Sequence, residues 1–245
     1  MRISSLSGTI ESEPALVGVA GVVLEAFPEG GLWWADRRLL VVADLHLEKG
    51  SSFARHGQML PPYDTGETLQ RLAALVDRLR PATVLALGDS FHDGDGARRL
   101  LPRDREHLAV LQRGRDFIWI AGNHVPHPSV LPGDHAAALT LGPVTFRHEP
   151  RAGAAPGEIA GHLHPAARVA GRSGSVRRKC FAGDGHRLIL PAFGAYAGGL
   201  NVLDRAFAGL FAPATFRVFV TGRTRLYAVG PGALRGDRNF STAGS

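Results

Sequence analysis

The sequence predicts an α/β protein in which two β-sheets form a sandwich flanked by helices, with a metal site at the carboxyl ends of strands. Apolar runs alternate with helical patterns between residues 39 and 120, as in a sheet covered by helices. Beyond residue 140 the pattern changes to short strands, which predicts a second, more antiparallel sheet packed on the first. Acidic and histidine residues follow several apolar runs, and ligands of such folds bind at strand ends.

Length and composition describe an ordinary globular chain. With 245 residues it can form one large domain, which we expect over residues 1–230, followed by a flexible tail at 231–245 that is rich in Gly, Arg and Ser. The hydrophobic content of 44% excludes a disordered or fibrous chain. The net charge of +6 comes mainly from arginine and favours phosphate-bearing partners, although a GC-rich genome also raises arginine content.

Cysteine usage and the amino-terminal segment bear on the location of the protein. Cys180 is the only cysteine, which excludes an internal disulfide framework and a thiolate zinc site and fits a reducing compartment. The apolar run at 15–24 is too short to span a bilayer, and no secretion signal precedes it. We therefore expect a cytoplasmic protein without a membrane partner.

The first elements lead into a central strand. Residues 15–25 predict a glycine-bent strand and residues 32–34 another, so that two hairpins precede the buried strand at 40–43. Residues 48–63 contain glycines and prolines without a sustained period, which predicts a long ordered loop over the strand ends. Lys49 and Arg55 in this loop are candidate substrate contacts, with solvated surface charge as the alternative.

Helices and strands then alternate. Asp64 and Glu67 have the spacing of a capping box, and an apolar stripe predicts a core-facing helix up to residue 79. A second helix is predicted at 99–113, with Leu100, Leu101, Leu108 and Leu111 facing inward. The predicted strands around and after these helices are 84–87, 117–120, 144–146, 158–160, 188–190, 217–220 and 225–229.

Residues that can bind a metal or a phosphate follow five of the apolar runs. They are Asp44 and His46, then Asp89, then Asn123 and His124, then His148, and finally His162 and His164. One Asp-x-His motif is weak support, because short motifs often arise by chance. Five such groups in order indicate a shared site, and mixed oxygen and nitrogen ligands suit manganese, iron or zinc.

The ordered pattern D-x-H, GD, GNH, H and GHxH resembles that of the calcineurin-like metallophosphoesterase superfamily over about residues 39–165. Within it, the chain is most similar to the bacterial ligase-associated DNA damage response endonucleases. That closer similarity rests on the sequences DLHLEKG at 44–50, GDSFHD at 88–93 and LPAFG at 190–194.

The resemblance implies a metallophosphoesterase-type sandwich that holds two divalent metals, with Mn²⁺ expected first and Fe, Zn, Co or Ni as alternatives. Asp44, His46 and His164 would bind one metal, Asn123, His148 and His162 the other, and Asp89 would bridge them. A metal-bridging hydroxide would attack the phosphodiester, with His124 as the general acid. The implied function is that of a DNA endonuclease in repair, associated with a DNA ligase, a helicase and an exonuclease.

Some positions depart from the family pattern or stay open. Val125 stands where an acid often follows the histidine, and His92, a candidate substrate contact, stands where an acid commonly follows the GD motif. Arg177 and Arg178 lie in a basic run that forms either a solvated hairpin loop or a path for a nucleic-acid backbone. The alternative functions are a phosphodiesterase of cyclic nucleotides or dinucleoside polyphosphates, and a catalytically weak metal-binding scaffold.

Overall fold

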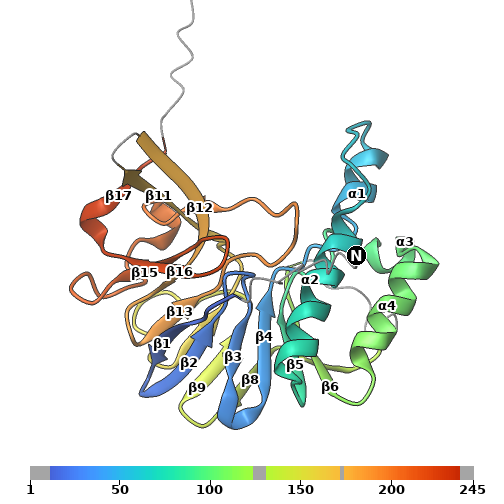
Figure 1. The fold of residues 1–245 in the computed structure, drawn as a ribbon, viewed down its shortest axis with the longest axis horizontal. Helices are drawn as coiled ribbons and strands as arrows, with labels where there is room; N and C mark the ends of the chain where they lie inside the picture. The colour runs from blue at the N-terminus through green and yellow to red at the C-terminus, as the bar shows by residue number, and fades with distance from the viewer. Residues whose placement is uncertain (1–11, 124–130, 172–173, 238–245) are drawn as a thin grey trace, which may run out of the picture.

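The computed structural model describes residues 12–123, 131–171 and 174–237. Two β-sheets pack face to face, and helices cover the outer face of the first sheet (Figure 1). This confirms the α/β sandwich that the sequence predicts.

The first sheet has seven strands in the order β1 to β7. Strands β1 to β4 pair antiparallel and β4 to β7 pair parallel. The carboxyl ends of β4, β5 and β6 therefore meet at one edge of the sheet. The strands are β1 (Ala15–Val19), β2 (Val22–Ala26), β3 (Leu32–Trp34), β4 (Leu39–Ala43), β5 (Thr83–Leu87), β6 (Asp116–Ile120) and β7 (Asp134–Ala136).

Strand β4 is buried at every residue. Because side chains alternate along a strand, Leu40 and Val42 pack into the core under the helices. Leu39, Val41 and Ala43 pack into the core between the two sheets. The carboxyl end of β4 is thus held from both sides.

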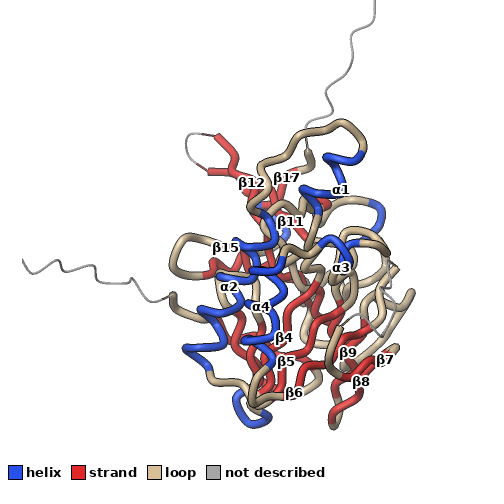
Figure 2. The backbone as a smooth tube through the Cα atoms, turned by 90° about the vertical axis from the view of Figure 1, so that its right-hand side faces the viewer, coloured by secondary structure: helices blue, strands red, loops and turns tan. Residues whose placement is uncertain are grey.

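The helices lie beside the parallel half of the first sheet, and α2 and α4 lie in front of β4, β5 and β6 in Figure 2. They are α1 (Lys49–Arg55), α2 (Asp64–Leu79), α3 (Gly96–Arg99) and α4 (Pro102–Gln112), with short 3-10 helices η1 (Ala35–Arg37), η3 (Arg205–Phe207) and η4 (Pro231–Ala233). The predicted apolar stripe of α2 packs into the core.

Two helical predictions are wrong in detail. Helix α1 forms where a loop was expected, because Asp64 accepts a hydrogen bond from the backbone N–H of Gly50 at 3.1 Å. Asp64 therefore anchors α1 and does not cap its own helix, whose N-cap is Tyr63. The second predicted helix is split, because Pro102 starts α4 as a new helix and leaves Leu101 exposed.

The predicted bent strand at residues 15–25 is also wrong. It is a hairpin of β1 and β2, because Ala20 and Gly21 both take positive φ and reverse the chain.

The second sheet has ten strands. Most of its pairs are antiparallel, but β10 pairs parallel with β9 and β13, and β11 pairs parallel with β14. Strands β11 and β12 form a long hairpin that rises beside the edge where β4 and β5 end (Figure 1). The strands are β8 (Ala138–Leu141), β9 (Val144–Arg147), β10 (Glu158–Ala160), β11 (Pro165–Gly171), β12 (Gly174–Gly183), β13 (Arg187–Ile189), β14 (Leu200–Asn201), β15 (Arg217–Thr221), β16 (Leu226–Val229) and β17 (Leu234–Arg235).

The carboxyl-terminal segment continues the fold beyond the predicted boundary at residue 230. Strand β17 pairs antiparallel with β11, and Asp237 accepts a hydrogen bond from Arg177 at 3.2 Å. Ordered structure therefore reaches residue 237, and the remainder of the expected tail, 238–245, lies outside the described residues.

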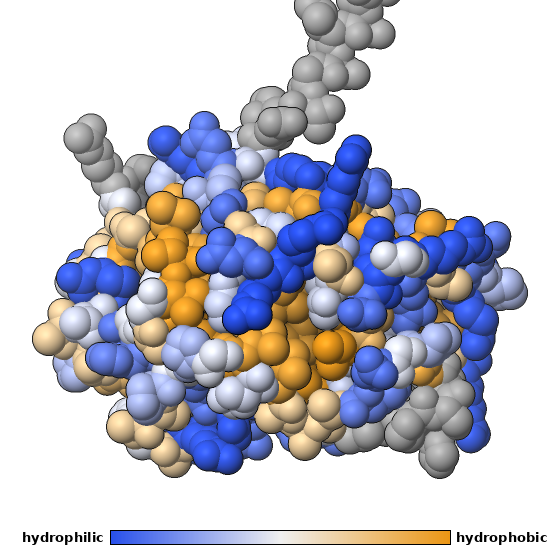
Figure 3. Space-filling model, turned by 90° about the horizontal axis from the view of Figure 1, so that it is seen from below, coloured by the Kyte–Doolittle hydropathy of each residue, from blue (hydrophilic) through white to orange (hydrophobic). Residues whose placement is uncertain are grey.

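The lower face of the molecule, which Figure 3 shows, has an apolar region across its middle with hydrophilic residues around it. This face lies opposite the edge where β4 and β5 end (Figure 1). Among the described helices, none has the length and apolar character needed to cross a bilayer.

Candidate metal centre

The candidate ligands come from both sheets and follow the carboxyl ends of five strands. Asp44 and His46 follow β4, Asp89 follows β5, and Asn123 follows β6. From the second sheet, His148 follows β9, and His162 and His164 follow β10. The structure brings these seven predicted ligands together, whereas His124 lies outside the described residues.

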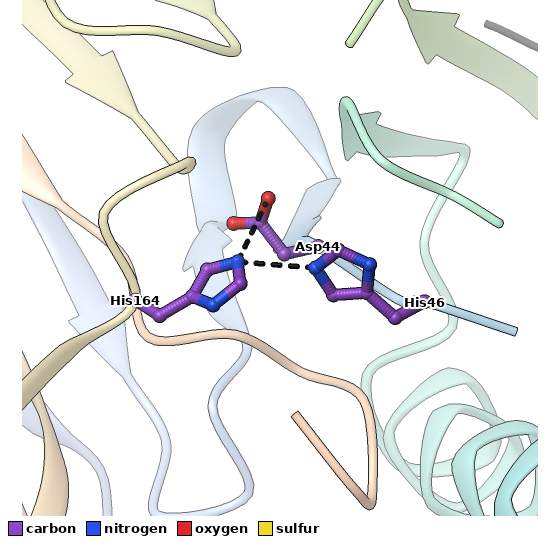
Figure 4. A group of neighbouring side chains, drawn as sticks. All are labelled: Asp44, His46 and His164. Carbon is purple, nitrogen blue, oxygen red and sulfur yellow. Dashed lines mark hydrogen bonds and ion pairs between the residues drawn. The ribbon is translucent and has the colours of Figure 1, made fainter. Parts of the chain in front are cut away.

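The first cluster consists of Asp44, His46 and His164, whose ligand atoms all lie within 4.8 Å of one another. The Nε2 atoms of His46 and His164 are 3.1 Å apart, and His164 Nε2 is 3.4 Å from Asp44 Oδ1. Figure 4 shows the three side chains pointing toward a common point from two different loops. This arrangement can hold one divalent cation.

The second cluster consists of Asp89, His148 and His162, which meet the same 4.8 Å limit. His148 Nε2 is 3.6 Å from Asp89 Oδ2 and 3.2 Å from His162 Nδ1. Asn123 Nδ2 lies 3.2 Å from His162 Nδ1, so the side-chain amide, whose oxygen can bind a metal, reaches this cluster. His148 Nδ1 lies 3.2 Å from the carbonyl oxygen of Leu87, so Nδ1–H can donate there and leave Nε2 for a metal.

The two clusters are contiguous. His148 Nδ1 of the second cluster is 3.6 Å from Asp44 Oδ1 of the first. The backbone N–H of His162 donates to Asp44 Oδ2 at 2.9 Å, and that of His46 donates to the backbone oxygen of Asp89 at 2.9 Å. A pair of neighbouring divalent ions can therefore share this site, as the resemblance implies.

The chemistry of the donors fits cations. Asp44 is fully buried, and its Oδ1 accepts no hydrogen bond from the described residues. Burial lowers the pKa of His46 to about 4; His164 adds to this shift and Asp44 opposes it. His46 is therefore neutral at pH 7, the form that binds metals. A mixed set of oxygen and nitrogen donors suits divalent manganese, iron or zinc.

The backbone is strained at the same residues. Asp44, His46, Asp89, His162 and His164 have φ angles between 37° and 68°, which is the left-handed region. This conformation is unfavourable by about 1–2 kcal/mol for an L-residue, although Asp tolerates it better than most. Residues with such strain cluster at functional sites, so this observation supports the site independently of the sequence motif.

Glycines beside the ligands allow close approach. A Cβ atom at Gly88 would lie 2.1 Å from His148 Nδ1, and one at Gly122 would lie 2.2 Å from the backbone nitrogen of Asp89. The glycines that precede Asp89 and Asn123 are therefore required by packing around the ligands.

The predicted substrate contacts around α1 are mostly engaged within the protein. Lys49 Nζ donates to the carbonyl oxygen of Tyr196 at 3.0 Å, and Arg55 forms an exposed ion pair with Asp95 at 3.7 Å. The ring of His92 packs edge-on against His46, with centroids 5.8 Å apart. Of the three, His92 therefore lies beside the candidate metal centre.

Arg177 and Arg178 of the basic run lie on strand β12 and not in a loop, and their side chains point to opposite faces of the strand. Arg177 donates to Asp237 at 3.2 Å and also to the carbonyl oxygen of Gly199. Arg178 points to the other face of β12 and has no hydrogen bond or ion pair with the described residues. The Arg177 side chain thus binds the carboxyl-terminal segment.

Two acids that support the site were not singled out from the sequence. Asp93 forms a two-point ion pair with Arg99, at 2.9 and 2.7 Å, and this guanidinium lowers the pKa of Asp93. Glu48 is buried and accepts hydrogen bonds from Ser51 and Thr65, while burial raises its pKa. The only signal for them is their place in the loops that follow β4 and β5.

Comparisons with known proteins identify the family of the chain. The nuclease MPE of Pseudomonas putida superimposes with a TM-score of 0.68 at 26% identity, covering 89% of this chain and 100% of that chain. Yfce, a phosphoesterase from E. coli, gives a TM-score of 0.39 at 14% identity, covering 80% of this chain and 99% of that one. Among curated proteins, no significant match is found. The family model of the calcineurin-like phosphoesterases matches residues 37–189, and the chain belongs to this family.

Proposed function

We propose that the protein is a two-metal phosphodiesterase that cleaves nucleic acid, with DNA as its substrate. The observation that carries this proposal is the pair of contiguous clusters at the strand ends, each able to hold a divalent cation. The similarity to a nuclease at 26% identity over 89% of the chain favours nucleic acid over small phosphodiesters.

The ligands divide between the two ions as the clusters do. Asp44, His46 and His164 would hold the first ion, and Asp89, His148 and His162 would hold the second together with Asn123. Asp89 is the residue that we propose as the ligand shared by both ions. When bound, the two ions lower the pKa of water and stabilise the charge that develops on the phosphate oxygens. The protein keeps its imidazoles oriented through contacts such as that of His148 with Leu87 O.

His124 is the proposed general acid. It directly follows Asn123 in the chain and is the histidine of the GNH motif. An imidazole there can protonate the leaving alkoxide of the cleaved strand. Because Val125 follows it, another group must orient the His124 ring.

The native metal and the cellular role are also part of the proposal. We infer Mn²⁺ as the native metal and a role in cytoplasmic DNA repair, alongside a DNA ligase, a helicase and an exonuclease. Genes for these three enzymes next to the gene for this protein would support that role.

The test compares four substrates with Mn²⁺, Co²⁺ and Ni²⁺ supplied separately: single-stranded DNA, plasmid DNA, an aryl phosphodiester and cyclic nucleotides. We expect metal-dependent cleavage of DNA and of the aryl phosphodiester. Asp89→Ala should abolish both, whereas His124→Ala should lower kcat by about 10²–10⁴-fold with metal content unchanged. A wild-type protein inert with every metal would refute the proposal, and a preference for cyclic nucleotides would redirect it to small phosphodiesters.

A further inference from the structure

A cavity of about 400 Å³ outside the candidate metal centre is lined by several cationic groups. Its walls come from the β2–β3 turn, helix α2, strand β12 and the β15–β16 turn. The side chains that matter for its chemistry are Arg71 of α2, Lys179 of β12 and Arg223 of the β15–β16 turn. None of them is a candidate metal ligand.

The strand pairing places this cavity at the metal-binding edge. Leu32 pairs with Val41 and Trp34 with Leu39, so the turn before β3 lies at the carboxyl end of β4. The segment 191–195, which forms another wall, is bonded to that same strand end. The N–H of Phe193 donates to Ala43 O at 2.8 Å, and the N–H of Gly194 donates to Asp44 O at 3.1 Å.

The positive charges of the cavity are incompletely neutralised. Lys179 Nζ donates to the carbonyl oxygens of Ala192 and Gly194, both at 2.8 Å, and no carboxylate of the described residues pairs with it. Arg223 is exposed and forms no hydrogen bond or ion pair with the described residues. The acid in the wall, Glu29, is already engaged by Arg78 at 3.5 Å.

Two further observations support an anion site. Burial lowers the pKa of Lys179 to about 8; the nearby cations Arg71 and Lys49 add to the shift, whereas Asp44 and Glu67 oppose it. Arg71 donates to Phe193 O at 2.9 Å and has only a longer contact of 3.4 Å with Glu67. An anion in the cavity would therefore meet cations from three separate elements.

We propose that this cavity binds a phosphate group of the substrate strand, next to the phosphodiester that reaches the metal centre. The inference rests on the proposed nuclease function and adds the path that the strand takes. Guanidinium and ammonium groups bind phosphate irrespective of the base, so the site contributes affinity without sequence preference. The strand then runs past Lys179 and Arg223, and not along Arg177, which Asp237 already holds.

The test uses Arg223→Glu, because this residue is exposed and its replacement disturbs no contact within the described residues. The matched control is Arg113→Glu, an exposed arginine just before β6 at the opposite edge of the sheet. For each variant, kcat and KM are measured with the aryl phosphodiester, a dinucleotide and longer single-stranded oligonucleotides at several salt concentrations.

We expect Arg223→Glu to raise KM for the longer oligonucleotides about tenfold or more and to leave the aryl phosphodiester unchanged. One lost phosphate contact should also flatten the slope of log affinity against log salt by about 0.7. The dinucleotide has no phosphate to place in the cavity, so its KM should not change. Arg113→Glu should match the wild type in every assay.

Each other outcome has a distinct meaning. If the wild type cleaves DNA and Arg223→Glu keeps its KM and salt slope, the strand path is refuted while the nuclease function stands. If the aryl phosphodiester and the oligonucleotides weaken together, the residue acts on the fold and the binding proposal fails. Inhibition of aryl phosphodiester hydrolysis by inorganic phosphate is measured for the same variants, and if only this inhibition changes, the cavity binds a free anion and not the strand. If no nucleic acid is cleaved, the proposed function itself fails.

Discussion

Gly161 allows a direct test of whether packing positions the Asp44 carboxylate for metal binding. A methyl group on residue 161 would lie 2.5 Å from Asp44 Oδ2 and 2.9 Å from the Cβ of Ala43. Optimal contacts between such atoms are about 3.5–4 Å, so Gly161→Ala forces the carboxylate to move by roughly 1 Å. Gly161 does not lie in the left-handed region, so the effect of the substitution is steric.

The size of the effect follows from this clash. Overpacking of a core typically destabilises by about 1–3 kcal/mol, which for a chain of this length lowers the Tm by about 2–12 °C. Misplacing the surroundings of a metal ligand lowers metal affinity by about 10–100-fold. We therefore expect a folded Gly161→Ala protein that melts slightly earlier and binds Mn²⁺ one to two orders of magnitude more weakly.

The effects on metal affinity and on stability are measured separately. Metal content by mass spectrometry and Mn²⁺ titration give the first, and thermal melts of the metal-free protein give the second. The control is Gly94→Ala, because a Cβ there meets no atom within 4 Å and Gly94 has no left-handed φ. It should keep metal affinity and change stability little. The reasoning is wrong if Gly161→Ala melts earlier but binds metal as tightly as the wild type.

Three further predictions concern buried charges. Asp44→Asn removes a buried carboxylate with an unsatisfied oxygen, so the metal-free protein should melt about 2–4 °C higher while its stabilisation by Mn²⁺ disappears in matched melts. The pKa of Lys179 is lowered to about 8 in the folded protein from its ordinary 10.5. Between pH 8 and 10.5 the folded state therefore binds fewer protons than the unfolded state, and the free energy of unfolding should rise with pH, by at most about 3 kcal/mol. Urea unfolding of Lys179→Met should lack this rise, and an equal rise in both proteins would contradict the assignment. Arg187→Met removes the 2.6 Å partner of the buried Glu158, which keeps Arg147 at 3.2 Å, and it also removes the hydrogen bonds of Arg187 to three carbonyl oxygens. It should destabilise by about 3 kcal/mol, and a loss below about 1 kcal/mol by urea unfolding would contradict this.

The positions of the candidate ligands could be predicted because they depend on local rules. An apolar run that ends in a polar residue predicts a strand end, and parallel strands bring their ends to one edge. Asp44 and Asp89 were therefore predicted correctly to lie at the ends of the neighbouring strands β4 and β5. The close placement of His162 and His164 beside them came from the family resemblance, since their strand belongs to the other sheet.

The remaining features could not be predicted because they depend on contacts between distant residues. Helix α1 has no apolar period and exists because the Asp64 side chain, 14 residues later, accepts a hydrogen bond from Gly50. The segment after residue 230 has the composition of a flexible tail, yet Arg177 and β11 hold it through Asp237 and β17. The inward direction of Lys179 depends on backbone oxygens of segment 191–195 that no sequence pattern indicates.

Burial of the hydrophobic core offsets the backbone strain at the candidate metal ligands. Five ligands in the left-handed region together destabilise the chain by roughly 5 kcal/mol at the lower end of the usual range. Burial of the four large aliphatic side chains of β4 alone stabilises it by about 6–12 kcal/mol, since each contributes about 1.5–3 kcal/mol. The core on the two sides of this one strand therefore offsets the strain at the site. We therefore expect the ligands to be in place before metal binds, so that chelation should lower the Tm without unfolding the protein.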